Sequence, residues 1–413
     1  MLCQSLSPLR LRIFDRTMTK ITLSVPDARK RIVHAQLLNT RNRVGTGEAA
    51  TLAAIEHLGY VQLDTLHVVA RAHHHTLWNR SGSYRTHHVD NLQRKGQVFE
   101  HWAHALAVLP MRDYRFSLPI MKRIASGDVH WYPKNKKVED RVLARIRAEG
   151  PLMARDFDDK PGSKAMWVRA PSKNALEQLF MEGELMIPYR VNFHKVYDLR
   201  ERVLPDDVDT RMPTTEELCR HLIGTFLRAQ GFGRAKQFAY LRKGMGKPMQ
   251  QTLLHMEEEG KIIKVEIGGE TYYALTTILD ELEQALPPSG FRILSPFDNA
   301  VIQRERVSAL FDFDYQIECY VKKENRVYGY FCLPLLYRNK LVGRLDAKAE
   351  RKSGVFQLLH LHLEKPVGSK EGFYKAFLAE LKRFAEFNGC QQLELQKVSG
   401  CNQARSVFKQ YGA

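Results

Sequence analysis

One tripeptide of the chain, Gln62-Leu63-Asp64, combines the two side chains that a hydrolytic site needs. It lies in a largely apolar run from Leu58 to Leu66, which favours an extended strand. In a strand, residues i and i+2 lie on one face, so the Gln62 amide and the Asp64 carboxylate point the same way. A carboxylate can activate a water molecule that a neighbouring amide orients. The alternative is an ordinary strand with solvent-facing polar residues, and the tripeptide alone does not decide between the two.

The composition indicates a polyanionic partner. Among 413 residues, Lys and Arg number 63 and Asp and Glu 46, giving a formal charge of +17. Such an excess favours nucleic acid first and an anionic membrane surface second, with a basic but uncommitted protein as the alternative. No apolar run reaches the roughly 18 residues of a membrane span, so none is expected. The six scattered cysteines form no C-x-x-C pair and predict reduced thiols in a cytosolic protein, with neither a disulfide framework nor a zinc site.

The first 17 residues lack the continuous apolar core of a secretory signal. We therefore expect 1–17 to be a disordered or non-native extension, with Met18 as a plausible start. The segment from Ser24 to Glu56 is helical by pattern, and Ser24 or Asp27 could cap its first helix.

The middle of the chain contains a weak internal duplication. In each copy a helical stretch ends at a glycine, Gly183 or Gly260, and two strand-like runs follow, so the period from 183 to 260 is 77 residues. Three helices followed by a two-stranded ribbon are the plan of a winged helix, whose third helix can lie in a DNA groove. Gly268-Gly269 predicts the tight turn of the second ribbon. The helical segment before Gln62 is a candidate start of a third, degenerate copy.

Beyond Pro287-Pro288-Ser289-Gly290 the pattern changes to short strand-like runs separated by turns. They predict a small antiparallel barrel or curved sheet, against which a helix from Lys370 to Asn388 packs. In one run Arg344, Asp346 and Lys348 alternate with apolar residues. These three side chains form either a paired surface ladder or a phosphate-binding stripe.

The resulting expectation is an α+β fold with tandem winged-helix motifs followed by a C-terminal small antiparallel β-barrel and its packed helix. The expected boundaries are 18–135 for an N-terminal helical, winged-helix-like region with the Gln-Leu-Asp motif, 136–210 and 211–286 for two winged helices, and 287–413 for the barrel domain.

Basic side chains near these elements are candidates for DNA contact, because their clustering adds to the overall charge. A solvated helix face would explain any one of them. His67 is a candidate contact to the lesion or backbone, with a structural role as the alternative, and Arg71 is a candidate to contact phosphate or to pair with Asp64. The full predicted DNA-binding set is His67, Arg71, Lys173, Arg190, His194, Lys195, Arg344 and Lys348.

A histidine-rich region, with His73-His74-His75, His87-His88, His101 and His104, invites a metal assignment. Consecutive histidines point in different directions, and no carboxylate or thiol stands at ligand spacing. We expect no metal and no cofactor. Trp102 is either a core aromatic or a stacking residue.

Several stretches together resemble the AlkZ/YcaQ-type winged-helix DNA glycosylases, and most closely their YcaQ-like branch. The similarity runs from about Ser24 to Leu363. The stretches are Gln62-Leu63-Asp64-Thr65, Val69-Ala70-Arg71, His101-Trp102-Ala103-His104, Val196-Tyr197-Asp198-Leu199, Leu294-Ser295-Pro296-Phe297-Asp298, Leu310-Phe311-Asp312-Phe313, Tyr328-Gly329-Tyr330, Leu333-Pro334-Leu335-Leu336, Leu341-Val342-Gly343-Arg344 and Asp346-Ala347-Lys348.

The resemblance implies tandem winged helices and a β-barrel that form a concave DNA-binding surface. It implies activity on N7-alkylated guanine and interstrand crosslinks, since Gln62-Leu63-Asp64 matches the aspartate form of the family motif. The expected partner is damaged double-stranded DNA, for a monomeric, cytoplasmic, nucleoid-associated bacterial enzyme.

On this hypothesis the enzyme is a monofunctional glycosylase. Asp64 activates water and stabilises the oxocarbenium-like sugar, and Gln62 orients the water. No amine nucleophile is evident near the motif, which argues against Schiff-base chemistry. The alternatives are a non-catalytic winged-helix regulator and a nucleic-acid scaffold in which the motif is structural.

Overall fold

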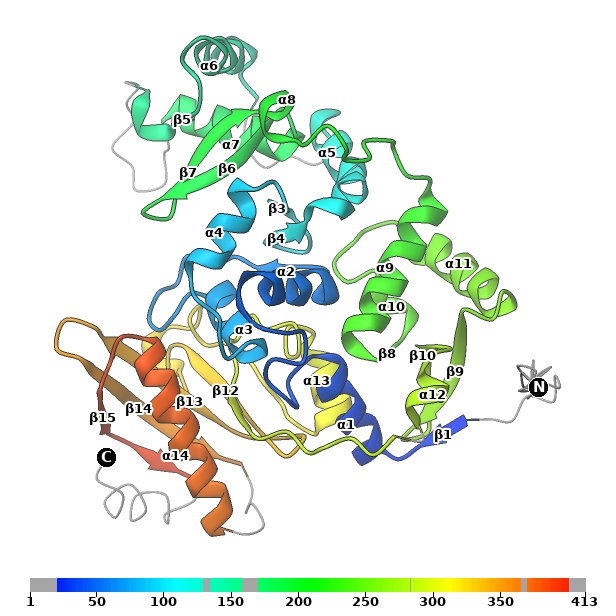
Figure 1. Cartoon of the computed structure of the whole chain (residues 1–413), viewed down its shortest axis with the longest axis vertical. Coiled ribbons are helices and arrows are strands. Elements are labelled where there is room, and N and C mark those ends of the chain that lie inside the picture. Colours follow the sequence, from blue (N-terminus) through cyan, green and yellow to red (C-terminus); the bar gives the residue numbers. More distant parts are fainter. Residues whose placement is uncertain (1–20, 129–133, 158–169, 283, 365–369, 401–413) are drawn as a thin grey trace, which may run out of the picture.

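The computed structural model describes residues 21–128, 134–157, 170–282, 284–364 and 370–400. The predicted extension 1–17 and Met18 lie outside these residues. The described chain is an α+β fold in which three stretches repeat one order of elements: helix, short strand, two helices, two strands (Figure 1). We call residues 47–110 unit 1, residues 136–199 unit 2 and residues 215–275 unit 3.

The bounds of the repeated elements show how closely the units correspond. Unit 1 contains α2 (Gly47–Leu58), β2 (Val61–Gln62), α3 (Ala72–Arg80), α4 (His87–Arg94), β3 (Val98–Trp102) and β4 (Leu106–Pro110). Unit 2 contains α6 (Lys136–Glu149), β5 (Leu152–Met153), the 3-10 turn η2 (Ala154–Asp156), α7 (Pro171–Glu182), β6 (Leu185–Val191) and β7 (His194–Leu199). Unit 3 contains α9 (Thr215–Gln230), β8 (Phe232–Gly233), α10 (Ala235–Phe238), α11 (Gly246–Glu258), β9 (Ile262–Ile267) and β10 (Glu270–Leu275).

The three small sheets have the same strand order. In each, the last strand is central and pairs antiparallel with the other two, giving β2-β4-β3, β5-β7-β6 and β8-β10-β9. β1 (Ile21–Leu23) joins the third sheet parallel to β9. The predicted duplication is therefore present in units 2 and 3. Unit 1 has the same order of elements and strands and is a third copy.

Glycines end the helices that precede the ribbons, as the sequence predicted. Gly183 and Gly260 have φ angles of 82° and 69°, and Gly96 takes the same place after α4 with φ 66°. These left-handed conformations cost glycine little because it has no Cβ. Gly268 and Gly269 form the predicted turn of the β9–β10 hairpin, with φ angles of 60° and 84°.

The first helix of unit 1 begins later than expected. Ser24 caps α1 (Val25–Ala35), since its Oγ accepts a 3.1 Å hydrogen bond from the Asp27 N–H, but α1 precedes the repeat. The repeat begins with α2. Between the units lie η1 (Met111–Ser117), α5 (Leu118–Ala125) and α8 (Arg200–Val203), and α12 (Ile278–Leu282) follows unit 3.

The C-terminal region forms an open mixed sheet in place of the expected closed antiparallel barrel. Its strand order is β11-β12-β13-β14-β15, and β15 and β16 both pair parallel with β14. Among the described residues its outermost strands β11 and β15 do not pair, so no closed barrel is found. The elements are β11 (Phe291–Ile293), α13 (Arg304–Phe311), η3 (Lys323–Asn325), β12 (Cys332–Tyr337), β13 (Lys340–Glu350), β14 (Val355–Leu363), α14 (Lys370–Phe387), β15 (Gln392–Leu395) and β16 (Val398–Ser399).

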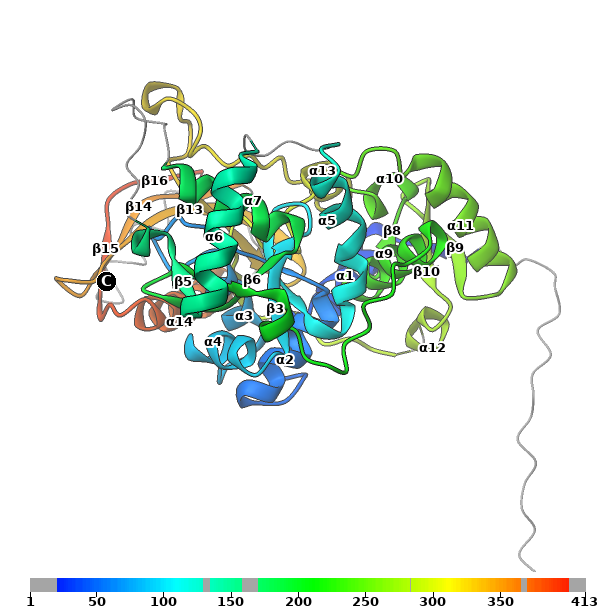
Figure 2. The same ribbon diagram turned by 90° about the horizontal axis from the view of Figure 1, so that it is seen from above.

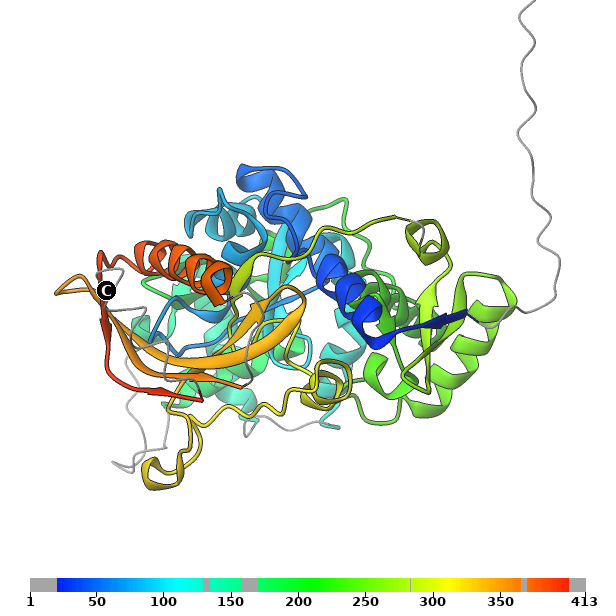
Figure 3. The same cartoon turned by 90° about the horizontal axis from the view of Figure 1, so that it is seen from below.

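The predicted helix α14 packs against this sheet, which curves past it (Figure 3). Phe377 and Phe384 of the helix share a core with Phe356 of the sheet, and the same core continues into unit 1 through Val61 and Leu63. The strand that precedes Asp64 is therefore held by packing in a large hydrophobic core.

An ion pair also joins unit 1 to the C-terminal region. Arg80 donates two hydrogen bonds to the Asp298 carboxylate, at 2.5 and 2.7 Å, and neither side chain is exposed. Unit 1 lies at the centre of the molecule, and Figures 1 and 2 place unit 3 at one end and the C-terminal sheet at the other. Among the described helices, none is long and apolar enough to cross a membrane.

Candidate functional site

Gln62 is held at the end of a short strand in unit 1. β2 pairs antiparallel with β4, with Gln62 opposite Ala107, and the Leu63 N–H donates to the Leu106 carbonyl at 2.8 Å. The Gln62 side chain is buried, and its Oε1 accepts a 3.1 Å hydrogen bond from His104 Nε2. Because this bond occupies the amide oxygen, the amide NH₂ is the end that remains to face a substrate or water.

Asp64 follows where the strand pairing ends. Its Oδ1 accepts a 2.8 Å hydrogen bond from the Leu66 N–H, which fixes the carboxylate in a local turn. The side chain is half-buried, and no cation pairs with it among the described residues. Burial raises the pKa of the Asp64 carboxyl, and the Leu66 N–H offsets this only in part. A carboxylate with a raised pKa is a stronger base.

Asp64 lies close to an exposed segment of the C-terminal region. Burial raises the pKa values of Cys319 and Tyr320, and the negative charge of Asp64 raises them further. Tyr320 is 81% exposed. The carboxylate is therefore bordered by an open surface on this side.

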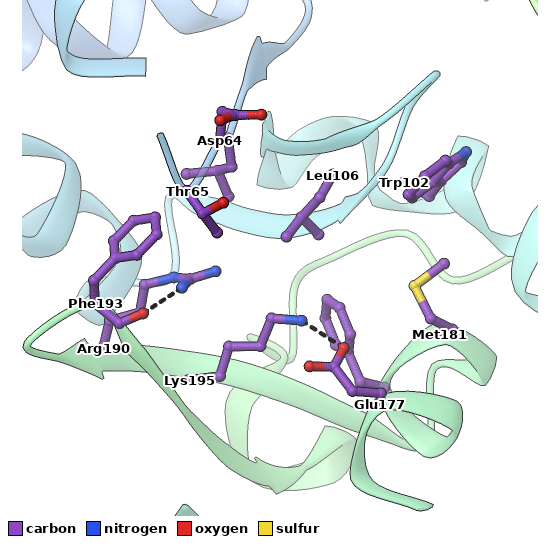
Figure 4. Close-up of a pocket in the computed structure, with 11 residues that line it drawn as sticks. Asp64, Thr65, Trp102, Leu106, Glu177, Met181, Arg190, Phe193 and Lys195 are labelled. Atoms are coloured by element: carbon purple, nitrogen blue, oxygen red, sulfur yellow. Dashed lines mark hydrogen bonds and ion pairs between the residues drawn. The ribbon is translucent and has the colours of Figure 1, made fainter. Parts of the chain in front are cut away.

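A cavity of about 280 Å³ lies between Asp64 and unit 2. Figure 4 shows Asp64 and Thr65 across from Lys195 and Glu177 of unit 2. Lys195 Nζ donates to Glu177 at 2.7 Å, and the Arg190 guanidinium donates two 2.6 Å hydrogen bonds to Glu100. The cations of this cavity are thus neutralised by carboxylates.

His104 belongs to a cluster of rings behind Gln62. Its ring lies 5.0 Å from that of Tyr60 and 5.6 Å from that of Tyr240, which comes from unit 3. Burial lowers the pKa of His104 to about 4, assisted by the charge of Arg242. The ring is therefore neutral near pH 7 and donates to Gln62 from a protonated Nε2.

Arg71 does not pair with Asp64. Its guanidinium carbon lies 3.9 Å from the ring centroid of Phe193, at the tip of the β6–β7 hairpin, and no carboxylate pairs with it among the described residues. His67 lies nearby with much of its side chain exposed. Partial desolvation of its ring lowers its pKa to about 4, and the charges of Arg351 and Arg71 add to the effect. Arg71 and His67 line a second cavity of about 400 Å³, which shares Phe193 with the first.

The other residues predicted to bind DNA lie in different environments. Lys173 and His194 are exposed on unit 2. Lys348 is exposed and pairs with Glu350. Arg190 and Lys195 line the cavity beside Asp64, where both are in the ion pairs described above.

Arg344 does not lie on an exposed stripe with Lys348. Its side chain is 5% exposed, donates to Glu364, and lies over the Tyr328 ring at 4.1 Å. Asp346 is buried too, and it accepts hydrogen bonds from the N–H groups of Tyr330 and Phe331. The register between β13 and β14 shifts after Asp346, so the simple alternation assumed from the sequence does not hold.

Sequence reasoning did not connect His104 with Gln62; it counted His104 among many histidines and within one of the stretches that carry the resemblance. The signal is long-range, because His104 reaches Gln62 through the β2–β4 pairing, across 42 residues. Among the described residues no group of three or more potential ligands could hold a metal ion.

Comparison with known proteins adds two findings. The family model described as DNA glycosylase AlkZ-like matches residues 55–387. The structure resembles Streptomyces sahachiroi DNA glycosylase AlkZ with a TM-score of 0.62 at 16% sequence identity, over 92% of this chain and 100% of that one. At this identity the structural match supports the fold, whereas the family match covers most of the chain, including the Gln62-Leu63-Asp64 motif.

Proposed function

Because the chain belongs to the AlkZ-like DNA glycosylase family, whose members are DNA-repair enzymes, we propose that it hydrolyses the N-glycosidic bond of N7-alkylated guanine in double-stranded DNA and unhooks interstrand crosslinks. The observation on which this proposal rests is Asp64, a half-buried carboxylate with a raised pKa and no cation partner among the described residues. It stands two residues from Gln62, whose amide oxygen is fixed by His104.

The proposed chemistry follows from the charge of the substrate. N7 alkylation makes guanine cationic, so the base leaves without needing much protonation. The barrier then lies in the oxocarbenium-like sugar and in the placement of water on its opposite face. Asp64 stabilises the developing positive charge and accepts the proton of the water, while the Gln62 NH₂ orients that water.

An open site suits a crosslinked base. Such a base remains attached to the opposite strand and cannot rotate fully into a deep pocket. The exposed Tyr320 near Asp64 supports attack at the duplex surface. Units 1 to 3 each have the element order of a winged helix, and we propose that all three are winged helices arranged around the DNA.

Arg71, which lies over the Phe193 ring, is the best-supported phosphate contact of the predicted set, because no carboxylate neutralises it among the described residues. Lys173, His194 and His67 are exposed and remain available for contact. We propose that a monomer of the protein acts on chromosomal DNA in the cytoplasm.

The test is release of modified base from duplex DNA that contains N7-methylguanine or a nitrogen-mustard crosslink. Wild type should release the base, and Asp64→Asn should bind the same duplex without releasing it. Asp113→Asn is the matched control, because burial also raises the pKa of this half-buried carboxyl, which does not line the cavity beside Asp64. Tight binding by wild type without release from either substrate would refute the proposal. Full activity of Asp64→Asn would refute the assigned role of the carboxylate.

A further inference from the structure

The turn between α10 and α11 of unit 3 places an exposed apolar side chain in a strained backbone. Leu241 has a φ angle of 57° and is 70% exposed. A left-handed conformation is unfavourable for an L-residue, and glycine would avoid that cost. Neither packing nor backbone geometry explains a leucine at this position, so the observation indicates a role for its side chain outside the folded core.

This turn lies next to the candidate site. Tyr240, the residue before Leu241, has its ring 5.6 Å from His104, and His104 donates to Gln62. The charge of Arg242, the residue after Leu241, contributes to the low pKa of His104 after burial itself. Leu241 is therefore flanked on both sides by residues that act on the His104–Gln62 pair.

The surroundings of the turn are basic. Arg242, Lys243 and Lys247 have no carboxylate partner among the described residues, and both lysines are exposed. Beside the turn, Lys247, Gln250 and other residues of α10 and α11 line an open hollow of about 620 Å³. Exposed, unpaired lysines beside an exposed apolar side chain suit a nucleic-acid backbone better than an apolar protein surface.

We propose that the turn is a DNA-contact element in which Leu241 enters the base stack beside the lesion, while the exposed Lys243 and Lys247 contact the flanking phosphates. Proteins that kink DNA use apolar wedges with adjacent basic residues in this way. A local kink would bring the sugar towards the half-buried carboxylate of Asp64. The inference rests on the proposed glycosylase function and adds a means by which the duplex is opened.

The test uses 2-aminopurine placed next to N7-methylguanine, since unstacking raises its fluorescence. The measurement is made in the Asp64→Asn background so that the duplex remains intact. Wild-type Leu241 should produce a fluorescence increase on binding. Leu241→Gly removes the side chain and the strain together and should abolish the increase. Leu254→Ala is the matched control, because Leu254 is 54% exposed on α11 of the same unit, and it should behave as wild type.

With Asp64 intact, Leu241→Gly should slow base release about tenfold or more, equivalent to about 1.4 kcal/mol of barrier. Leu241→Met, which retains a long apolar side chain, should recover most of the rate. The thermal midpoint of Leu241→Gly should equal or exceed that of wild type, which excludes misfolding as the cause. Unchanged fluorescence and release in Leu241→Gly would overturn the inference. Absence of base release by wild type would instead refute the glycosylase proposal, and the fluorescence experiment would still test the wedge.

Discussion

Replacing His104 with phenylalanine should impair catalysis while preserving the fold. The ring is half-buried beside Tyr60 and Tyr240, so a phenyl ring can keep these contacts. What the substitution removes is the 3.1 Å hydrogen bond to the Gln62 side chain. The buried amide can then rotate, and its NH₂ is no longer held in the direction in which, on the proposed mechanism, it orients the attacking water.

The magnitude follows from the kind of hydrogen bond that is lost. With a pKa of about 4, His104 is neutral at pH 7, so the bond joins two neutral groups. Such a bond contributes about 0.5–1.5 kcal/mol net, and a buried acceptor left without a donor costs about 1–3 kcal/mol. If this cost falls on the transition state, 1–3 kcal/mol corresponds to a rate reduction of about 5- to 150-fold.

The assay is single-turnover release of N7-methylguanine at saturating enzyme, with DNA affinity and urea stability measured in parallel. A positioning role predicts a lower rate constant with nearly unchanged affinity. His104→Asn keeps an N–H donor on a shorter side chain and should recover part of the rate.

A double-mutant cycle with Gln62→Ala separates positioning from a general structural effect. Once Gln62 is absent, His104→Phe should cause little further loss. Two additive effects would refute the reasoning, because His104 would then act independently of Gln62.

Three further predictions follow from the charged groups. Burial raises the pKa of the Asp64 carboxyl, and its ionised form is the one that accepts the proton of the water. The rate of guanine release should therefore fall as pH is lowered through a pKa above that of an ordinary aspartate. A fall in rate that follows the ordinary aspartate pKa would contradict this. Arg190→Met leaves the buried Glu100 carboxylate without its cation and should cost about 3–5 kcal/mol of unfolding free energy in urea. The Arg190→Met, Glu100→Gln double variant should regain most of this loss. Lost DNA binding at unchanged stability would instead make Arg190 a DNA contact. Arg80→Met should cost a similar amount by the same measurement, because Asp298 is fully buried, and a loss below about 1 kcal/mol would contradict the pairing argument.

Local sequence signals predicted the repeated elements well. Gly183, Gly260 and the Gly268-Gly269 turn were identifiable because left-handed backbone favours glycine. The β6–β7 turn illustrates the limit of this signal. There Asn192 and Phe193 adopt φ angles of 50° and 69°, and tertiary contacts, including the Arg71 guanidinium 3.9 Å from the Phe193 ring centroid, accompany this unfavourable conformation.

Long-range contacts account for most of what sequence reasoning missed. Arg190 pairs with Glu100 across 90 residues, and Gln62 with His104 across 42 residues. Arg344 pairs with Glu364, 20 residues away. A basic residue near a predicted ribbon looks the same in the sequence whether it faces phosphate or a buried carboxylate. The open C-terminal sheet has the same cause, because parallel pairing of β15 and β16 with β14 depends on the connection through α14.

The pairing of charges explains how a protein with a net charge of +17 keeps the Asp64 carboxylate free of a cation partner among the described residues. In the cavity beside Asp64, Arg190 and Lys195 are neutralised by Glu100 and Glu177. A cation bound directly to Asp64 would lower its pKa and stabilise the carboxylate before the reaction began. Catalysis requires interactions that strengthen in the transition state. No such cation is found among the described residues. On the proposed mechanism, the positive charge that forms on the sugar is the partner of Asp64, and a lysine or arginine introduced beside Asp64 should therefore slow base release even if it tightens DNA binding.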